Sequence, residues 1–261
     1  MNKNKFFAIF CLILLCPISW AQHSRASYMY ELPAYYSAPF FYSAYTVQFN
    51  TVTNIPDWVA WRLDKTRLGN ITVSRSGNSF KPDPNLGDLS PISADYTNSG
   101  YDRGHMCPAN DCLQSGDALL ESFYMSNVCP QKSSLNRRSW GTLEDKCHTW
   151  ILDNFFEALY IVCGPVPDEM EKVIVTERRH IVVPKRLFKA IIGEKRKGGY
   201  VGIAFIFDQK GHASPMSIDD VEAIIHMDLF ANFPKRMSRR VESAKPRRED
   251  WPGMEAIGMN R

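Results

Sequence analysis

Apolar and aromatic residues occur along this chain in short runs, most of which have the length of a β-strand. Residues 45–50 and 58–63 are rich in aromatic and β-branched side chains, and turn-forming residues separate them. This pattern predicts a pair of antiparallel strands. Similar runs predict further strands at residues 158–163, 180–183 and 200–207.

Other segments have the spacing of helices. Residues 117–126 and 136–159 predict two helices, since in the second segment the apolar residues recur near a 3.6-residue period. A third helix is expected to begin at Ser217, a suitable N-cap residue followed by acidic residues. Strands precede and follow these helices without a regular β-α-β alternation. The predicted fold class is therefore α+β, with a central mixed, mainly antiparallel sheet flanked by helices.

The two ends of the chain differ in character from its middle. Lysines precede a short apolar run over residues 6–16, and small residues lead up to Ala21, which predicts a signal peptide at residues 1–21. An aromatic-rich N-terminal extension follows at residues 22–44, and the chain is basic and irregular over residues 236–261. We therefore expect a secreted or periplasmic protein, with one folded domain between two extensions.

Composition narrows the class of protein. The chain has 261 residues, of which 44% are hydrophobic and 23% charged, and its formal net charge is +3. These values indicate a globular protein and exclude a strongly basic coating. Removal of residues 1–21 leaves 29 basic against 28 acidic residues, so any attraction to nucleic acid must come from local patches. No long apolar run follows residue 21, and we expect no stable membrane insertion after signal cleavage.

Five cysteines remain after the signal peptide, an odd number for an exported protein. One or two disulfides with a free or intermolecular thiol fit this count, and the pairing stays open. A zinc site built from these cysteines and His148 lacks paired C-x₂₋₄-C spacing on both sides, so a disulfide near residue 107 is the preferred interpretation. The five are Cys107, Cys112, Cys129, Cys147 and Cys163.

The strongest chemical motif is the segment from Asp102 to His105, which reads Asp-Arg-Gly-His. A neutral histidine can take a proton from water, and the guanidinium of Arg103 can hold phosphate oxygens or stabilise charge that develops on them. The set therefore suits attack on a phosphodiester. A turn with an ordinary ion pair is the alternative interpretation of the motif alone.

A second set of polar residues follows within 40 positions. Asn136, Trp140 and Glu144 are spaced by four residues, so on a helix they form one stripe. An amide oxygen is a hard neutral ligand, and Mg²⁺ keeps several waters while binding few protein oxygens. A carboxylate such as Glu144 can hold those waters. A helix-terminal asparagine and a solvated carboxylate are the alternative.

These motifs, together with the segments 123–131 and 135–140, resemble in order and spacing the DNA/RNA non-specific endonucleases of the ββα-metal type, the Serratia nuclease and endonuclease G family. The resemblance covers roughly residues 45–235, which we take as a nuclease domain. It implies a ββα-metal active-site motif within the predicted fold. It also implies Mg²⁺, with Mn²⁺ as a substitute, and metal-assisted hydrolysis of DNA and RNA that leaves 5′-phosphate ends.

The resemblance implies roles for individual residues. His105 matches the general base, Asn136 the direct protein ligand of the metal, and Glu144 the carboxylate that holds the water shell of the metal. Arg103 matches the arginine near the phosphate and leaving group. The remaining candidates line or support the site: Asp102 as a structural acid, Asn127 as a site-lining asparagine, and Arg137 and Arg138 as phosphate contacts.

The chain departs from the bacterial pattern at three places. Phe123 replaces an asparagine, His148 replaces an arginine, and Asn78 aligns near an upstream arginine for which Arg75 is the closest substitute. Substrate contacts are therefore expected to differ. An idle nucleic-acid-binding or partner-binding domain on the same scaffold is the alternative function, although a binding module has no need of a base and a metal ligand in register. A homodimer is left open.

Overall fold

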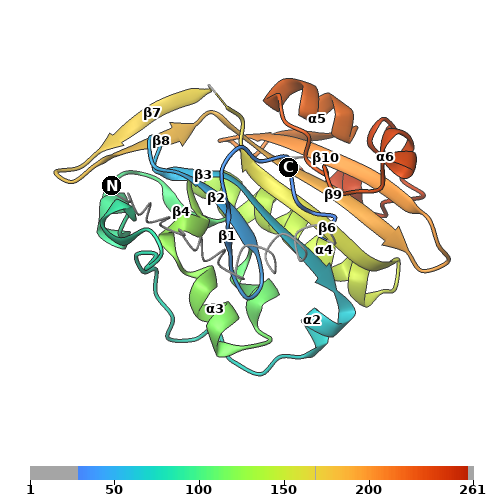
Figure 1. The fold of residues 1–261 in the computed structure, drawn as a ribbon, viewed down its shortest axis with the longest axis horizontal. Coiled ribbons are helices and arrows are strands. Elements are labelled where there is room, and N and C mark those ends of the chain that lie inside the picture. Colours follow the sequence, from blue (N-terminus) through green and yellow to red (C-terminus); the bar gives the residue numbers. More distant parts are fainter. Residues whose placement is uncertain (1–28, 168, 258–261) are drawn as a thin grey trace, which may run out of the picture.

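The computed structural model describes residues 29–167 and 169–257, so the predicted signal peptide at residues 1–21 lies outside the described part. A seven-stranded sheet in which every neighbouring pair is antiparallel forms the centre of the molecule (Figure 1). Its strands, in spatial order, are β1 (Phe40–Phe41), β2 (Thr46–Asn50), β3 (Ile55–Asp64), β6 (Phe156–Pro165), β9 (Arg186–Lys195), β10 (Tyr200–Asp208) and β11 (Ala213–Met216).

Both faces of this sheet are buried because its central strands alternate two sets of apolar side chains. In β3, Trp61 joins the core on one face, and Trp58 joins the core on the other. Helix α4 (Gly141–Leu152) packs on the Trp61 face. Helices α5 (Ile218–Ile225) and α6 (Lys235–Glu242) pack on the Trp58 face (Figure 1). The result is an α+β sheet with helices on both sides, as the sequence predicted.

A small antiparallel pair lies beside the large sheet, on the same side as α4. Strand β4 (Asp102–His105) pairs with β5 (Val128–Gln131), and a π-helical turn (Leu135–Trp140) then leads directly into α4. The predicted ββα motif is therefore present as two strands followed by a helix. The remaining elements are α2 (Lys65–Gly69), α3 (Gly116–Ser122), and a hairpin of β7 (Met170–Val175) and β8 (His180–Pro184).

The structure corrects several predicted boundaries. The helix expected over residues 136–159 ends at Leu152, because Asn154 adopts a left-handed conformation with φ of 64° and the chain then enters β6. The predicted helix was too long because the first apolar residues of β6 continue the apolar pattern of the helix. The helix predicted at residues 117–126 ends earlier, at Ser122.

A central strand, β9, was not predicted at all. Its apolar run is interrupted by Lys189 and ends in the polar residues Glu194 and Lys195, which weakens the alternating signal of a strand. Even so, β9 lies between β6 and β10 and Lys189 itself is buried. The charged residue Lys189, at a core position, is therefore the reason that sequence analysis missed this central strand.

The prediction that the chain beyond Pro234 is irregular is wrong. Its first part forms helix α6, and its later part is anchored in the core. Trp251 is fully buried, with its ring centroid 4.9 Å from that of Trp150, and its indole N–H donates to the Gly202 carbonyl at 3.2 Å. Residues of the N-terminal extension also pack down, with Leu32 fully buried. Among the described residues, no helix combines the length and apolar character that a membrane crossing requires.

Candidate active site

A cavity of about 420 Å³ opens where the small β4–β5 pair meets the start of α4. Its wall brings together residues from the Asp102–His105 motif and from the helical stripe that begins at Asn136. Residues from the preceding loop complete it. The lining residues are Arg75, Phe80, Tyr101, Asp102, Arg103, His105, Pro108, Ala109, Asn110, Asn136, Arg137 and Glu144.

The pairing of β4 with β5 places His105 at this wall. Gly104 lies opposite Cys129 in the register, and a Cβ atom at Gly104 would collide with the side-chain amide of Gln131. The absence of a side chain at Gly104 therefore leaves room for the side chain of Gln131. The His105 ring packs against Phe80, with centroids 4.8 Å apart, and edge-on against Phe123 at 5.1 Å.

Burial keeps the imidazole of His105 uncharged. Burial, together with a smaller effect of the nearby positive charge of Arg75, lowers the pKa of His105 to about 3. Among the described residues, no group forms a hydrogen bond with Nε2, which is buried against the rings. A neutral imidazole has a free lone pair, which is the state that a general base requires.

Asn136 is oriented by an acid from the neighbouring strand. Its Nδ2 donates to Asp102 Oδ2 at 3.1 Å, so the amide oxygen of Asn136 is left to accept or to coordinate. Asp102 also accepts two hydrogen bonds from Arg137, at 2.9 and 3.1 Å. These bonds from Arg137 hold the pKa of Asp102 below its usual value. Asp102 therefore remains an anion that fixes both neighbours.

Three arginines line the cavity, and Arg75 and Arg103 supply positive charge beyond the Arg137–Asp102 pair. The guanidinium of Arg103 is held by the Ser93 carbonyl, to which Nε donates at 3.1 Å and Nη2 at 2.6 Å. Arg75 lies in the wall, whereas Asn78 does not and instead donates to the Arg75 carbonyl at 3.4 Å. The structure thus places the proposed substitute arginine, and not the aligned asparagine, at the site.

Glu144 lies in the first turn of α4 and has 22% of its side chain exposed. Burial raises its pKa to about 7, although the ammonium of Lys189, 3.5 Å from Oε1, opposes that rise. Lys189 was not among the residues that the sequence singled out. The nearest signal was its position as a lone charge inside an apolar run.

Two predicted site residues lie elsewhere. Asn127 is fully buried, and its side chain binds the backbone N–H and carbonyl of Cys107 and the carbonyl of Ser122. It fixes the segment that follows His105 and does not line the cavity. Arg138 is exposed and is also absent from the wall. Sequence analysis missed Phe80 and Asn110, which line the cavity from loop positions with no local motif.

All five described cysteines are buried thiols. Cys107 and Cys112 lie close, with their sulfurs 3.8 Å apart, which is well beyond a disulfide bond length. The expected disulfide near residue 107 is therefore not formed. Within the described residues, no cysteine belongs to a cluster with metal-binding spacing, so the structure also gives the zinc alternative no support.

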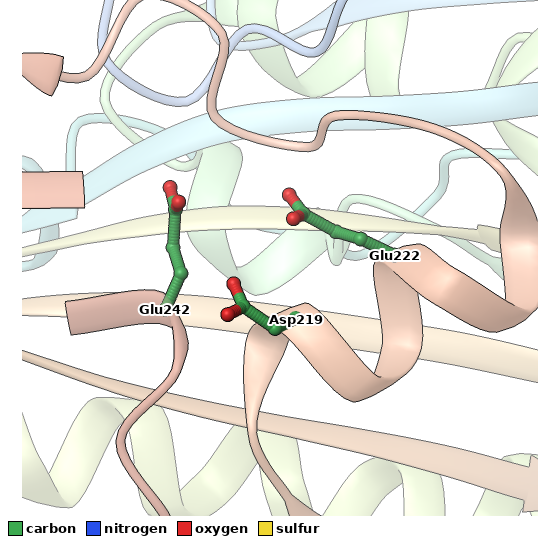
Figure 2. A group of neighbouring side chains, drawn as sticks. All are labelled: Asp219, Glu222 and Glu242. Atoms are coloured by element: carbon green, nitrogen blue, oxygen red, sulfur yellow. The ribbon is translucent and has the colours of Figure 1, made fainter. Parts of the chain in front are cut away.

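One acidic cluster lies away from this cavity, on the opposite face of the large sheet. Figure 2 shows the carboxylates of Asp219, Glu222 and Glu242 pointing toward one another from α5 and the end of α6, and their oxygens lie within 4.8 Å. Glu222 already accepts the Leu229 backbone N–H at 2.7 Å, and Glu242 accepts the Ser238 hydroxyl. The first bond ties α5 to the segment that follows it, and the second lies within α6; none of the three acids lines the cavity of His105.

The donors in the cavity of His105 fit a hard divalent cation better than a soft one. The amide oxygen of Asn136 and the carboxylate of Glu144 are both oxygen donors in the cavity wall, and the thiols nearby are protonated and buried. Burial raises the pKa of the Cys107 thiol, which keeps it from acting as a thiolate ligand. Mg²⁺ prefers a site that offers few protein oxygens and leaves room for several waters, as this cavity does.

Known proteins resemble this chain in sequence over most of its length. Residues 23–236 match the family described as DNA/RNA non-specific endonuclease. The chain is 29% identical to a nuclease of Nostoc over 76% of this chain and 75% of the relative, and 29% identical to the nuclease of Serratia marcescens over 77% of each. It is 33% identical to the mitochondrial nuclease EXOG of Danio rerio, over 59% of this chain but only 47% of that protein.

A solved structure supports the fold. The EndoG chain in a complex with its inhibitor EndoGI superposes with a TM-score of 0.69 at 23% identity, covering 78% of this chain and 89% of that chain. Identity this low speaks for the fold alone. The family match, which spans most of the chain, carries the assignment: this protein belongs to the DNA/RNA non-specific endonuclease family.

Proposed function

We propose that this chain is a Mg²⁺-dependent, sugar-non-specific endonuclease that hydrolyses phosphodiester bonds of DNA and RNA. The observation that carries the proposal is the shared cavity wall. Besides the Asp102–Arg137 pair it gathers a neutral histidine, an oriented asparagine, the carboxylate of Glu144 and the two arginines Arg75 and Arg103. Each of these groups has a distinct use in phosphodiester hydrolysis, and a binding surface alone has no need of the neutral base.

The chemistry follows from the positions of these groups. His105 takes a proton from the water that attacks phosphorus, while Arg103 and Arg75 hold the non-bridging oxygens on which charge develops. The bond from phosphorus to the 3′ oxygen breaks, so the phosphate stays on the 5′ end of the product. Asn136 would hold the metal directly and Glu144 would hold it through water. When bound, Mg²⁺ or Mn²⁺ supplies Lewis-acid charge for the phosphate and the leaving oxygen.

We also propose export to the periplasm or the medium, since residues 1–21 have the pattern of a signal peptide. Some relatives are named as mitochondrial, so a mitochondrial location is the alternative. Fractionation of cells that express the full chain distinguishes the two, and N-terminal sequencing of the secreted product is expected to begin at residue 22.

The activity is tested with the chain from residue 22, incubated with supercoiled plasmid and with structured RNA, in Mg²⁺ or in EDTA. We expect both substrates to be cut only with metal, and His105→Ala to lower kcat by about 10²–10⁴-fold, the usual contribution of a general base. His180→Ala, which removes an exposed histidine on β8, is the control.

Two results would contradict the proposal. Cutting that survives EDTA would remove the role of the metal. Retarded migration of nucleic acid on a gel without cleavage would favour an idle binding domain on this scaffold.

A further inference from the structure

A lysine lies in the core directly beneath the candidate active site. Lys189 belongs to β9, between β6 and β10, and its side chain points to the same sheet face as Leu187 and Ile191. It is 1% exposed, and it is the single fully buried lysine in the described part of the chain. Lysines are almost never buried unless a partner compensates the charge.

Three groups surround the ammonium of Lys189. Its Nζ lies 3.9 Å from the ring centroid of Trp140 and 5.7 Å from that of Trp61. The same atom lies 3.5 Å from Oε1 of Glu144. The indole faces attract the cation and hold it from two elements, the π-helical turn and β3. Within residues 29–167 and 169–257, the carboxylate of Glu144 is thus the one acid paired with an ammonium whose position the rings fix.

A second pair of charges lies next to this one. Asp111 is 2% exposed, accepts the indole N–H of Trp61 at 2.8 Å and pairs with His148. Trp61 connects the two pairs, since its ring faces Lys189 and its N–H binds Asp111.

Stability alone does not explain a lysine at this position. Replacing a buried ion pair by apolar residues of similar volume is often neutral or stabilising, because desolvation of the charges offsets their attraction. Methionine is an unbranched, flexible apolar side chain, so filling the space between the two tryptophans does not by itself require a charge. The lysine is therefore better explained by what its charge does to Glu144.

We infer that Lys189 is a positioning residue that holds the carboxylate of Glu144 at the cavity wall, where it can bind the water shell of the metal. The inference rests on the proposed function, which assigns Glu144 to that shell. The two aromatic rings fix the ammonium, and the ammonium fixes Oε1 of Glu144, so that the partly exposed carboxylate presents a defined oxygen to the cavity. Groups in such outer positions commonly alter metal affinity by about 10–100-fold when they are lost.

The test is a double-mutant cycle of Lys189→Met and Glu144→Gln, with Mg²⁺ binding measured by calorimetry on the metal-free protein without nucleic acid. We expect Lys189→Met to weaken Mg²⁺ binding by about 10-fold or more, and to lower kcat while the KM for DNA changes little. In the Glu144→Gln background the same substitution is expected to have no further effect, because Lys189 acts through that carboxylate. Lys189→Arg, which keeps the charge, is expected to bind Mg²⁺ more tightly than the Met variant.

Lys195→Met is the matched control, since Lys195 lies on the same strand and pairs with Asp250 at 2.5 Å, away from the cavity. It is expected to leave Mg²⁺ affinity and kcat unchanged. Equal metal affinity in wild type and Lys189→Met, or an equal loss in both backgrounds, would overturn the inference. So would a Met variant that does not fold while the Arg variant folds and binds Mg²⁺ no better than Glu144→Gln. Absence of cleavage by the wild type would instead refute the proposed function, because the binding cycle uses no substrate.

Discussion

At the residue scale, the candidate site separates its charges into pairs with different tasks. Asp102 is neutralised by Arg137 and orients Asn136, whereas Glu144 receives an ammonium from below and is open to the cavity above. His105 packs against the rings of Phe80 and Phe123, and this burial, with the positive charge of Arg75, keeps it uncharged. Similar local pairs of charges predict how the stability of the fold depends on pH.

The ion pair of His148 with Asp111 gives one such response. Burial disfavours the charge on His148, but the hydrogen bond and charge of Asp111 outweigh it and raise the pKa of His148. A raised folded-state pKa stabilises the fold fully below the unfolded value of about 6.5, and the contribution is lost as the pH rises through the folded value. Urea unfolding of wild type and His148→Gln should therefore differ most in acid and converge toward alkaline pH.

His212→Gln is the control for that measurement, because His212 pairs with Asp208 but is exposed. Its effect on the free energy of unfolding should be small at every pH. A stability difference for His148→Gln that grows as the pH rises would contradict the assignment of a charged His148.

At the scale of elements, the site depends on how β4 and β5 pack together, with the side chain of Gln131 on β5 lying against Gly104 on β4. Most of the predicted site residues could be recognised from the sequence because they lie within one local ββα unit, on β4 and on the turn that follows β5. Lys189 and Phe80 could not, since they come from β9 and from a loop and reach the site only through tertiary packing. Strand β9 itself was missed because that buried lysine broke its apolar pattern.

Gly104→Ala tests the closeness of the two strands. The added Cβ would collide with the side-chain amide of Gln131, and we expect overpacking to cost about 1–3 kcal/mol in the free energy of unfolding. Displacement of His105 should also reduce cleavage. Gly116→Ala is the control, since a Cβ there meets nothing within 4 Å. Equal stability of the two alanine variants in urea would show that the Gln131 side chain can move aside for a Cβ atom at residue 104.

At the scale of the whole molecule, the chain closes its core with its last part. The Trp251 ring lies 4.7 Å from that of Phe156 and 4.9 Å from that of Trp150, so it joins the start of β6 to helix α4. The same helix carries Glu144. Residues predicted as a basic extension therefore hold an element of the site, a contact that no pattern in so polar a segment indicates.

Trp251→Ala is expected to destabilise the protein by about 3–5 kcal/mol, the usual cost of removing a large buried aromatic side chain. Thermal unfolding measures the effect, and the Mg²⁺-dependent rate well below the new melting temperature should stay close to that of wild type. Tyr36→Ala, at a ring that is 79% exposed, is the control. An unchanged melting temperature for Trp251→Ala would mean that the C-terminal segment does not contribute to the core.

The anchoring of Trp251 has a consequence for how the protein is inactivated. The segment between α6 and Trp251 is polar, and several of its residues are exposed. A single proteolytic cut there would detach the tryptophan while leaving every cavity residue on the other fragment. We expect the cut protein to lose activity at a lower temperature than the intact protein, because Trp251 would no longer be tethered to the core.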